Sequence, residues 1–93
     1  MNNRGAERRL QILDAGVAIW PNVSARNIGK SLDLSHAAIL YHFKSSAALR
    51  DAVAQHAVDR MDKRVVAALL VEQHPATSQM DDADRRACLE GLF

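Results

Sequence analysis

Apolar residues recur every three or four positions along most of the chain, and this spacing places them on one face of a helix. The first helix is expected from about residue 6 to residue 20. Pro21 sets its end, because proline has no backbone N–H to donate and disfavours helical geometry in the residue before it. One face of this helix carries Leu10, Leu13, Val17 and Trp20.

Two short helices joined by a tight turn are expected next, over about residues 24–32 and 35–43. Ser24 and Ser35 belong to the residue types that cap a helix by accepting an amide hydrogen bond from its first turn. Gly29 lies where the two helices must nearly touch, and Asp33 lies where the chain reverses, a place that often needs positive φ. The apolar anchors are Ile28, Leu32, Leu34 and Ile39. The segment is therefore predicted to be a helix-turn-helix.

A long fourth helix is predicted from Ser45 or Ser46 to about residue 72 or 73, before His74 and Pro75 stop it. At about 1.5 Å per residue it would span about 40 Å. A short last helix is predicted over about residues 79–90, with Ser78 as its cap and Gly91 as its stop. The predicted fold class is all-α. A three-helix head, residues 1–46, is followed by a helical dimerisation region, residues 47–93, within one continuous small domain.

The charges are distributed unevenly, although the formal net charge of the 93 residues is only +1. Residues 1–50 hold seven basic and three acidic side chains, whereas residues 51–93 hold five basic and eight acidic ones. An acidic half is repelled by phosphate, so the basic half is the one that can face a nucleic acid. The alternative is that these are scattered charges on a solvated surface.

Residues with catalytic or metal-binding chemistry are sparse. The four glycines are isolated, and the four histidines, His36, His42, His56 and His74, show no His-Glu-x-x-His spacing. Cys88 is the single cysteine, which excludes an internal disulfide, and no base lies near it in the sequence. We therefore expect no enzyme activity, no metal and no cofactor. Without a membrane-length apolar run or a signal peptide, we expect a cytoplasmic protein with no membrane partner.

The run Ile39-Leu40-Tyr41-His42-Phe43-Lys44 resembles the end of the recognition helix in the tetracycline-repressor (TetR) family of bacterial transcriptional regulators. Residues 11–15 and 24–28 are similar to parts of that family's first two helices, and the resemblance covers about residues 7–57. Leu40 departs from the family's phosphate-contacting Tyr, Ser46 from a frequent Lys and Asp33 from the usual turn Gly. The link from residue 20 to residue 23 is also shorter. The chain is thus similar to a divergent, very short member.

The resemblance implies a head that binds double-stranded DNA, with the start of the recognition helix in the major groove. The expected readers of base edges are His36, Ala37 and Ala38. The expected phosphate contacts are Ser24, Arg26, Ser35, Tyr41, His42 and Lys44, with an N-terminal arm formed by Arg4, Arg8 and Arg9. Structural alternatives are His42 packed beneath the third helix, Tyr41 partly in the core, Arg26 paired with Asp14 or Asp33, and the arginines at a solvated helix start.

The short last helix can fold back over the apolar end of the fourth, but two short helices make a thin core, so a second copy of the chain is expected to complete it. The alternative is a self-contained monomer. The cluster around residues 65–71 is almost wholly apolar, which is too hydrophobic for the surface of a soluble monomer. The predicted dimer interface consists of Met61, Val65, Ala68, Leu69, Leu89, Leu92 and Phe93. A two-fold dimer presents two recognition helices about 34 Å apart and so selects a palindrome.

These features together predict a homodimeric repressor that occupies a palindromic operator in a bacterial nucleoid. Residues 75–93 are too few to enclose a ligand pocket, so, if the chain has its natural length, we expect no small-molecule inducer. Repression would then follow the protein's own concentration or occur in concert with another repressor protein. So compact a regulator suits a plasmid or a phage. The alternative function is a protein-binding adaptor or co-regulator that uses the apolar C-terminal helices, with a vestigial helix-turn-helix.

Overall fold

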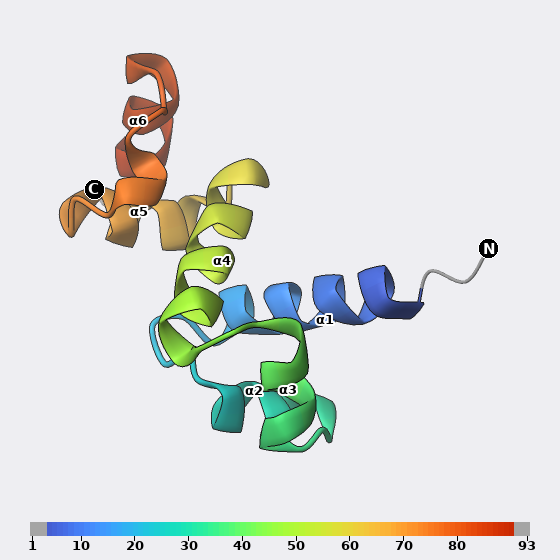
Figure 1. The fold of residues 1–93 in the computed structure, drawn as a ribbon. Coiled ribbons are helices and arrows are strands. Elements are labelled where there is room, and N and C mark those ends of the chain that lie inside the picture. The colour runs from blue at the N-terminus through green and yellow to red at the C-terminus, as the bar shows by residue number, and fades with distance from the viewer. Residues whose placement is uncertain (1–3, 91–93) are drawn as a thin grey trace. The chain divides into compact units, whose positions relative to one another are not determined.

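The computed structural model describes residues 4–90, and within them it contains helices and no strand (Figure 1). The elements are α1 (Arg4–Ala18), α2 (Ala25–Leu32), α3 (His36–His42), α4 (Ser46–Asp59), α5 (Lys63–Val71), the 3-10 helix η1 (Pro75–Thr77) and α6 (Asp82–Leu89). The all-α fold class is therefore confirmed for this part of the chain. The chain divides between Val53 and Ala54 into two compact units, which are described separately below.

The first unit contains α1, α2, α3 and the first part of α4. Within it, α2 contacts both α1 and α3. Gly16 lets α1 approach α4 closely, because a Cβ atom at this glycine would lie 2.5 Å from a methyl carbon of Val53. The buried apolar side chains of this unit are Ile12, Leu13, Trp20, Ala25, Ile28, Ile39, Phe43, Leu49 and Val53.

The buried face of α1 differs in part from the predicted one. Leu13 is buried as expected, and so is Trp20, which follows the end of α1 at Ala18. Val17 is half-buried, but Leu10 is 49% exposed. Ile12 and Gly16 are buried instead, and their separation of four residues stacks them on one face of the helix. A pattern of large apolar side chains does not detect a contact made through a glycine, which explains the error.

Serine caps begin the next three helices where the sequence predicts them. The Oγ atoms of Ser24, Ser35 and Ser45 each accept a hydrogen bond from the backbone N–H three residues later, at 3.0, 3.1 and 3.0 Å respectively. Each bond satisfies one of the N–H groups that have no partner inside the helix. The starts of α2, α3 and α4 are therefore fixed by local chemistry.

The predicted long fourth helix is wrong, because the chain breaks between α4 and α5. Met61 has a φ of 53°, and the N–H groups of Met61 and Asp62 donate to the carbonyl oxygens of Val58 and Ala57 at 3.0 and 2.9 Å. This pair of bonds is a Schellman turn, which ends a helix at a left-handed residue. Asp62 then caps α5, since its Oδ1 accepts from the Val65 N–H at 3.0 Å.

The second unit contains the end of α4 together with α5, η1 and α6, and α5 packs against both η1 and α6. Thr77 is buried although it is polar, and its hydroxyl donates to the His74 carbonyl oxygen at 2.8 Å. The buried apolar residues of this unit are Ala54, Ala57, Val65, Val66, Ala67, Leu69 and Cys88.

The last helix begins later than predicted. His74 caps η1, since its Nδ1 accepts from the Ala76 N–H at 3.0 Å. Asp81, not Ser78, caps α6 through a bond of 2.8 Å from the Asp84 N–H to its Oδ1. An aspartate followed by further acidic residues is a favourable start, because carboxylates interact well with the positive end of the helix dipole. The predicted stop at Gly91 lies outside the described residues.

Candidate nucleic-acid interface

The turn between α2 and α3 brings these two helices into contact. Asp33 has φ 57° and ψ 47°, which confirms the predicted positive φ. The N–H groups of Asp33 and Leu34 both donate to the Gly29 carbonyl oxygen, at 2.8 Å for Leu34. A Cβ atom at Gly29 would lie 2.5 Å from the Leu34 carbonyl oxygen. The close approach predicted at Gly29 is therefore present, and it is made to the backbone of the turn.

The outer face of α3 consists of small and aromatic side chains. His36 and Ala37 are exposed, and Ala38 is half-buried. Tyr41 is 86% exposed, so the alternative that it lies partly in the core is wrong. Its ring lies edge-on to that of His42, with 5.3 Å between the ring centroids. All three predicted base readers thus lie together at the start of α3.

A shallow, open depression of about 460 Å³ lies beside this face. Sequence reasoning did not foresee it, because it forms where α3 meets the preceding turn and the start of α1. Its lining is mostly apolar and consists of Arg8, Leu34, Ser35, Ala37, Ala38, Tyr41 and His42, all of the first unit.

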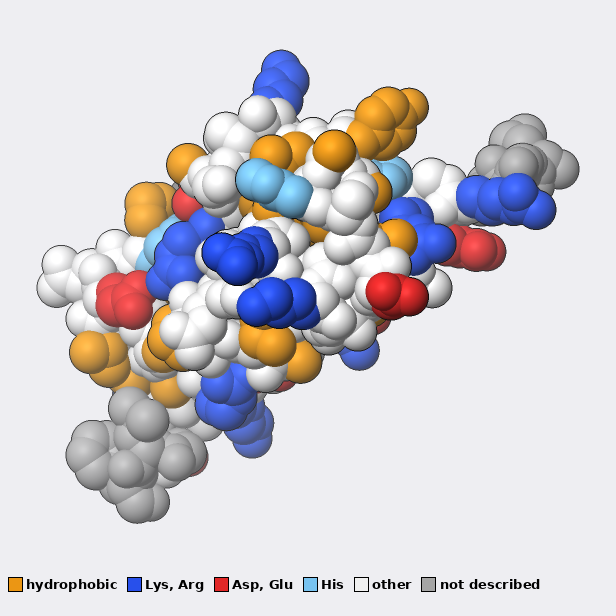
Figure 2. Space-filling model, turned by 90° about the horizontal axis from the view of Figure 1, so that it is seen from below, with side chains coloured by type: hydrophobic (Ala, Val, Ile, Leu, Met, Phe, Trp, Pro, Cys, Tyr) orange, Lys and Arg blue, Asp and Glu red, His pale blue; other side chains and the backbone are white. Residues whose placement is uncertain are grey.

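The predicted phosphate-contacting side chains belong to α2, to α3 and to the residues beside them. Arg26, Ser35 and Lys44 are exposed, whereas Ser24 and His42 are half-buried. The cap bonds use the two serine hydroxyls as acceptors, which leaves each hydroxyl hydrogen to donate elsewhere. Figure 2 views the structure from the side on which α2 and α3 lie in Figure 1, and Lys and Arg side chains lie there beside small apolar patches.

The arginines predicted to form an N-terminal arm lie in helix α1. Arg4 is its first residue, and Arg4, Arg8 and Arg9 are all exposed. The Arg9 guanidinium lies 4.5 Å from the centroid of the Phe43 ring, and its Nη1 donates to the His42 carbonyl oxygen at 3.4 Å. These three arginines are therefore helical, and Arg9 contacts the end of α3 and the residue that follows it.

Arg50 makes a second contact of this kind, which sequence reasoning missed. Its guanidinium lies 4.2 Å from the centroid of the Trp20 ring, and its Nη1 donates to the Pro21 carbonyl oxygen at 2.7 Å. The hydrogen-bond partners of Arg9 and Arg50 are 33 and 29 residues away in sequence, so no local spacing indicates them. Two basic residues of the first unit thus bind the protein's own backbone.

The residues predicted to form a dimer interface differ in exposure. Val65 and Leu69 have no exposed surface in the single chain, since α5 packs against η1 and α6. Met61, Ala68 and Leu89 are half-buried, whereas Leu92 and Phe93 lie outside the described residues. The apolar side chain of α5 that does face solvent is Val71, which is 68% exposed.

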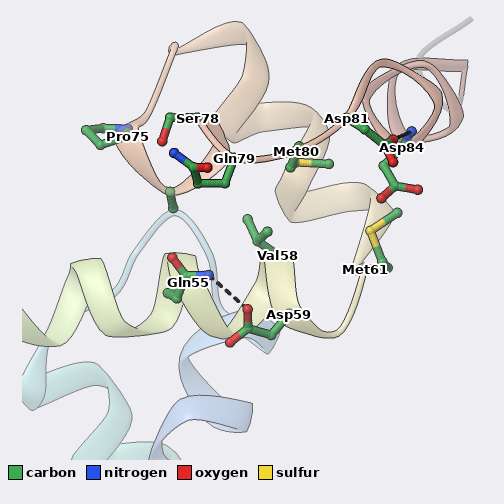
Figure 3. Close-up of a pocket in the computed structure, with 11 residues that line it drawn as sticks. Gln55, Val58, Asp59, Met61, Pro75, Ser78, Gln79, Met80, Asp81 and Asp84 are labelled. Carbon is green, nitrogen blue, oxygen red and sulfur yellow. Dashed lines mark hydrogen bonds between the residues drawn. The ribbon is translucent and has the colours of Figure 1, made fainter.

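The second unit holds an open groove of about 450 Å³ between the end of α4, η1 and the start of α6 (Figure 3). Its lining combines apolar side chains with three carboxylates, and it includes Val58, Met61, Met80, Asp59, Asp81 and Asp84. Asp59 accepts a bond of 2.8 Å from the Gln55 side-chain amide, and Asp81 is occupied as the cap of α6. Within residues 4–90, no group of three or more acidic, histidine or cysteine side chains is arranged to hold a metal ion.

Among residues 4–90, no helix has the length and apolar character needed to cross a membrane. The chain matches no protein-family model, no curated protein and no solved structure.

Proposed function

We propose that this chain is a sequence-specific DNA-binding transcriptional repressor that acts as a homodimer on a palindromic operator. The observation that carries the proposal is the pair α2 and α3, joined by a tight turn at Asp33, with small side chains on the outer face of α3. In a helix-turn-helix, the second helix lies in the major groove and its first residues contact base edges. Ala37 and Ala38 are small enough to let a helix approach the bases closely.

Charge around these helices supports the same proposal. Arg8, Arg26, Lys30 and Lys44 are exposed in the first unit. Basic side chains attract the phosphate backbone and supply most of the affinity for DNA that does not depend on sequence. Phosphate contacts of this kind fix the position of a recognition helix, whereas contacts with base edges give specificity.

We also propose that the chain is related to the TetR family. Leu40, which replaces the family's phosphate-contacting Tyr, is half-buried, whereas Tyr41 beside it is exposed. We therefore assign the phosphate contact to Tyr41. On this assignment the chain is a divergent relative that has the family's type of head.

The test of DNA reading is a titration of the protein with short duplexes over a range of salt concentrations. A DNA reader loses affinity steeply with salt and still prefers one sequence from a random duplex pool. Equal and weak binding to every duplex would contradict the proposal and favour the protein-binding adaptor.

Two substitutions separate phosphate contacts from base reading. Lys44→Ala should weaken binding to all duplexes alike, whereas His36→Ala should change which sequence is preferred. Lys63→Ala is the matched control, because Lys63 is an exposed lysine of the second unit and should not affect DNA binding. A Lys44→Ala variant that loses affinity for one sequence alone would refute this division of roles.

Homodimer formation is proposed because one recognition helix reads only a few base pairs. Exposed Val71 and half-buried Ala68, both on α5, are the apolar positions that we propose for contact with the second copy. Sedimentation at micromolar concentration should give twice the 10.2 kDa of one chain. Val71→Glu should shift the mass toward one chain, and Gln79→Glu, the same added charge at another exposed position, should not. A wild-type mass of one chain would exclude the dimer.

A further inference from the structure

The hydrogen-bonding chemistry of α3 limits which bases it can read. Its seven residues, His-Ala-Ala-Ile-Leu-Tyr-His, include no Arg, Lys, Asn, Gln, Asp or Glu. The bidentate pairs that identify guanine and adenine, and the carboxylate contact that identifies cytosine, need those side chains. Specificity from α3 must therefore come from other groups, and most of its outer face is hydrocarbon.

The depression beside α3 is formed mainly by such hydrocarbon groups. Leu34, Ala37, Ala38 and Tyr41 supply its apolar lining, and Arg8 and His42 lie on its polar part. Ala37 and Tyr41 are exposed, so this surface is open to a ligand. The one apolar group that an unmodified base pair presents in the major groove is the 5-methyl group of thymine.

We infer that the depression lined by Leu34, Ala37, Ala38 and Tyr41 is a methyl-reading surface that selects thymine in the operator. This inference rests on the proposed function, and it names the chemical group that the recognition helix reads. The occupant is DNA because the apolar surface lies in a unit with a basic excess and beside Arg8, and because the exposed Lys44 follows the lining residue His42 by two positions in the sequence. Specificity then comes from burying methyl groups, and the surrounding cations supply affinity.

Deoxyuridine gives a direct test, because it differs from thymidine only by the missing 5-methyl group and keeps the same hydrogen bonds. The full chain is titrated with the duplex recovered from a random pool, and each thymine is replaced singly by uracil. At the contacted positions the affinity should fall about fourfold for each methyl group removed, which is the loss expected when one methyl group is no longer buried. Uracil elsewhere in the duplex should have no effect.

The converse experiment adds the methyl group to another base pair. At a contacted position, a 5-methylcytosine·guanine pair should bind about fourfold more tightly than a cytosine·guanine pair. Because both pairs present the same donors and acceptors in the major groove, the difference reports the methyl group alone.

Protein variants assign the effect to the depression. Ala37→Gly should reduce the ratio of thymine to uracil affinity toward one, whereas Ala47→Gly, the same change at an exposed helical position outside α3, should leave this ratio unchanged. Circular dichroism of both variants checks that they are folded, and the ratio is insensitive to a shared loss of folded protein.

The outcomes separate the inference from the proposed function. Selective duplex binding that no uracil substitution changes would overturn the methyl-reading surface and leave the repressor proposal standing. If the ratio of thymine to uracil affinity were the same for Ala37→Gly and Ala47→Gly, the assignment of methyl reading to this depression would be overturned. A chain without any sequence preference would overturn the proposed function itself.

Discussion

Single residues in left-handed geometry decide where several helices of this chain stop. Asp33, Met61 and Gln73 have φ values of 57°, 53° and 57°, and they follow the ends of α2, α4 and α5. Glycine is the usual residue at such positions, and another residue there costs about 1 kcal/mol or more. The turns persist because their backbone N–H groups donate to the last carbonyls of the helices, as the Gln73 and His74 N–H groups do at the end of α5.

Gly29 gives the clearest stability prediction at the level of one residue. Gly29→Ala should destabilise the protein by about 1–3 kcal/mol, because the new Cβ would overlap the Leu34 carbonyl oxygen and the backbone would have to move. Urea unfolding followed by circular dichroism measures the change. Gly5→Ala is the matched control, since a Cβ there meets no atom within 4 Å and the change should be neutral or slightly stabilising. Equal effects would contradict the close approach.

The thiol of Cys88 should make the free energy of unfolding depend on pH. Burial raises the pKa of its thiol. The positive charge of Lys63 lowers this pKa, and the negative charges of Asp84 and Asp62 raise it. Below about pH 8 the thiol is protonated in both states and contributes nothing to the pH dependence. Above this pH the unfolded chain loses the proton first, so the free energy of unfolding should decrease as pH rises. Urea unfolding at pH 7 and pH 9.5 should show a larger decrease for the wild type than for Cys88→Ala. Equal decreases would refute the raised pKa.

At the scale of elements, the break between α4 and α5 can be tested by a substitution at Asp62. Its effect on the free energy of unfolding has opposite signs for a broken and for a continuous helix. Asp62→Ala should lower the free energy of unfolding by about 1 kcal/mol, because α5 loses its cap. In one continuous helix the same change would raise stability, since alanine is the better helix former. Asp62→Asn keeps a capping oxygen and should stay close to the wild type. Chemical denaturation of the three proteins decides between the two structures.

The sequence predicts helix starts better than helix ends in this chain. Ser24, Ser35 and Ser45 are capping residues, and the helices begin beside them. The end of α4 carries neither glycine nor proline, so the apolar spacing continues through Met61 and suggests one long helix. The Schellman turn depends on a positive φ at Met61, and the presence of a methionine does not predict this conformation. The available signal was Asp62, a capping residue within the apparent helix.

The candidate site shows the same division between local and distant features. Asp33, Gly29 and the cap of α3 follow from spacing within a dozen residues, and the sequence places them well. The contacts of Arg9 with Phe43 and of Arg50 with Trp20 join residues far apart in sequence, and no periodicity indicates them. The burial of Val65 and Leu69 depends on the packing of α5 on α6. The apolar run indicates that the last helix can fold back here, but not which side chains it covers completely.

At the scale of the whole molecule, the count of basic side chains overstates the number available for the proposed DNA binding. Seven basic residues lie within residues 1–50, but Arg9 and Arg50 bind backbone carbonyls and aromatic rings of the protein. At most five then remain to neutralise phosphates in each head. Arg9 and Arg50 keep their charge, but fewer basic side chains are available for direct contact with phosphate than the sequence suggests.

This count sets a limit on the salt dependence of DNA binding. Each neutralised phosphate contributes a slope of about −0.9 to a plot of log affinity against log salt. The slope should therefore be no steeper than about −4.5 for one head and about −9 for a dimer. Fluorescence anisotropy at several salt concentrations measures the slope. Lys44→Ala should reduce it by about one per head, whereas Lys63→Ala should not change it. A slope near −6 per head would mean that Arg9 and Arg50 also contact phosphate.

The turn at Met61 also determines where the chain can be divided for study. Helix α4 is continuous across the boundary between Val53 and Ala54, so a cut there would split a helix and leave new unpaired carbonyls. A cut after Met61 would leave α4 whole in one fragment, and Asp62 would begin the other as the cap of α5. Exposed Arg60 offers trypsin a cleavage site one residue before that point. A fragment of residues 1–61 thus keeps α1 to α4 whole.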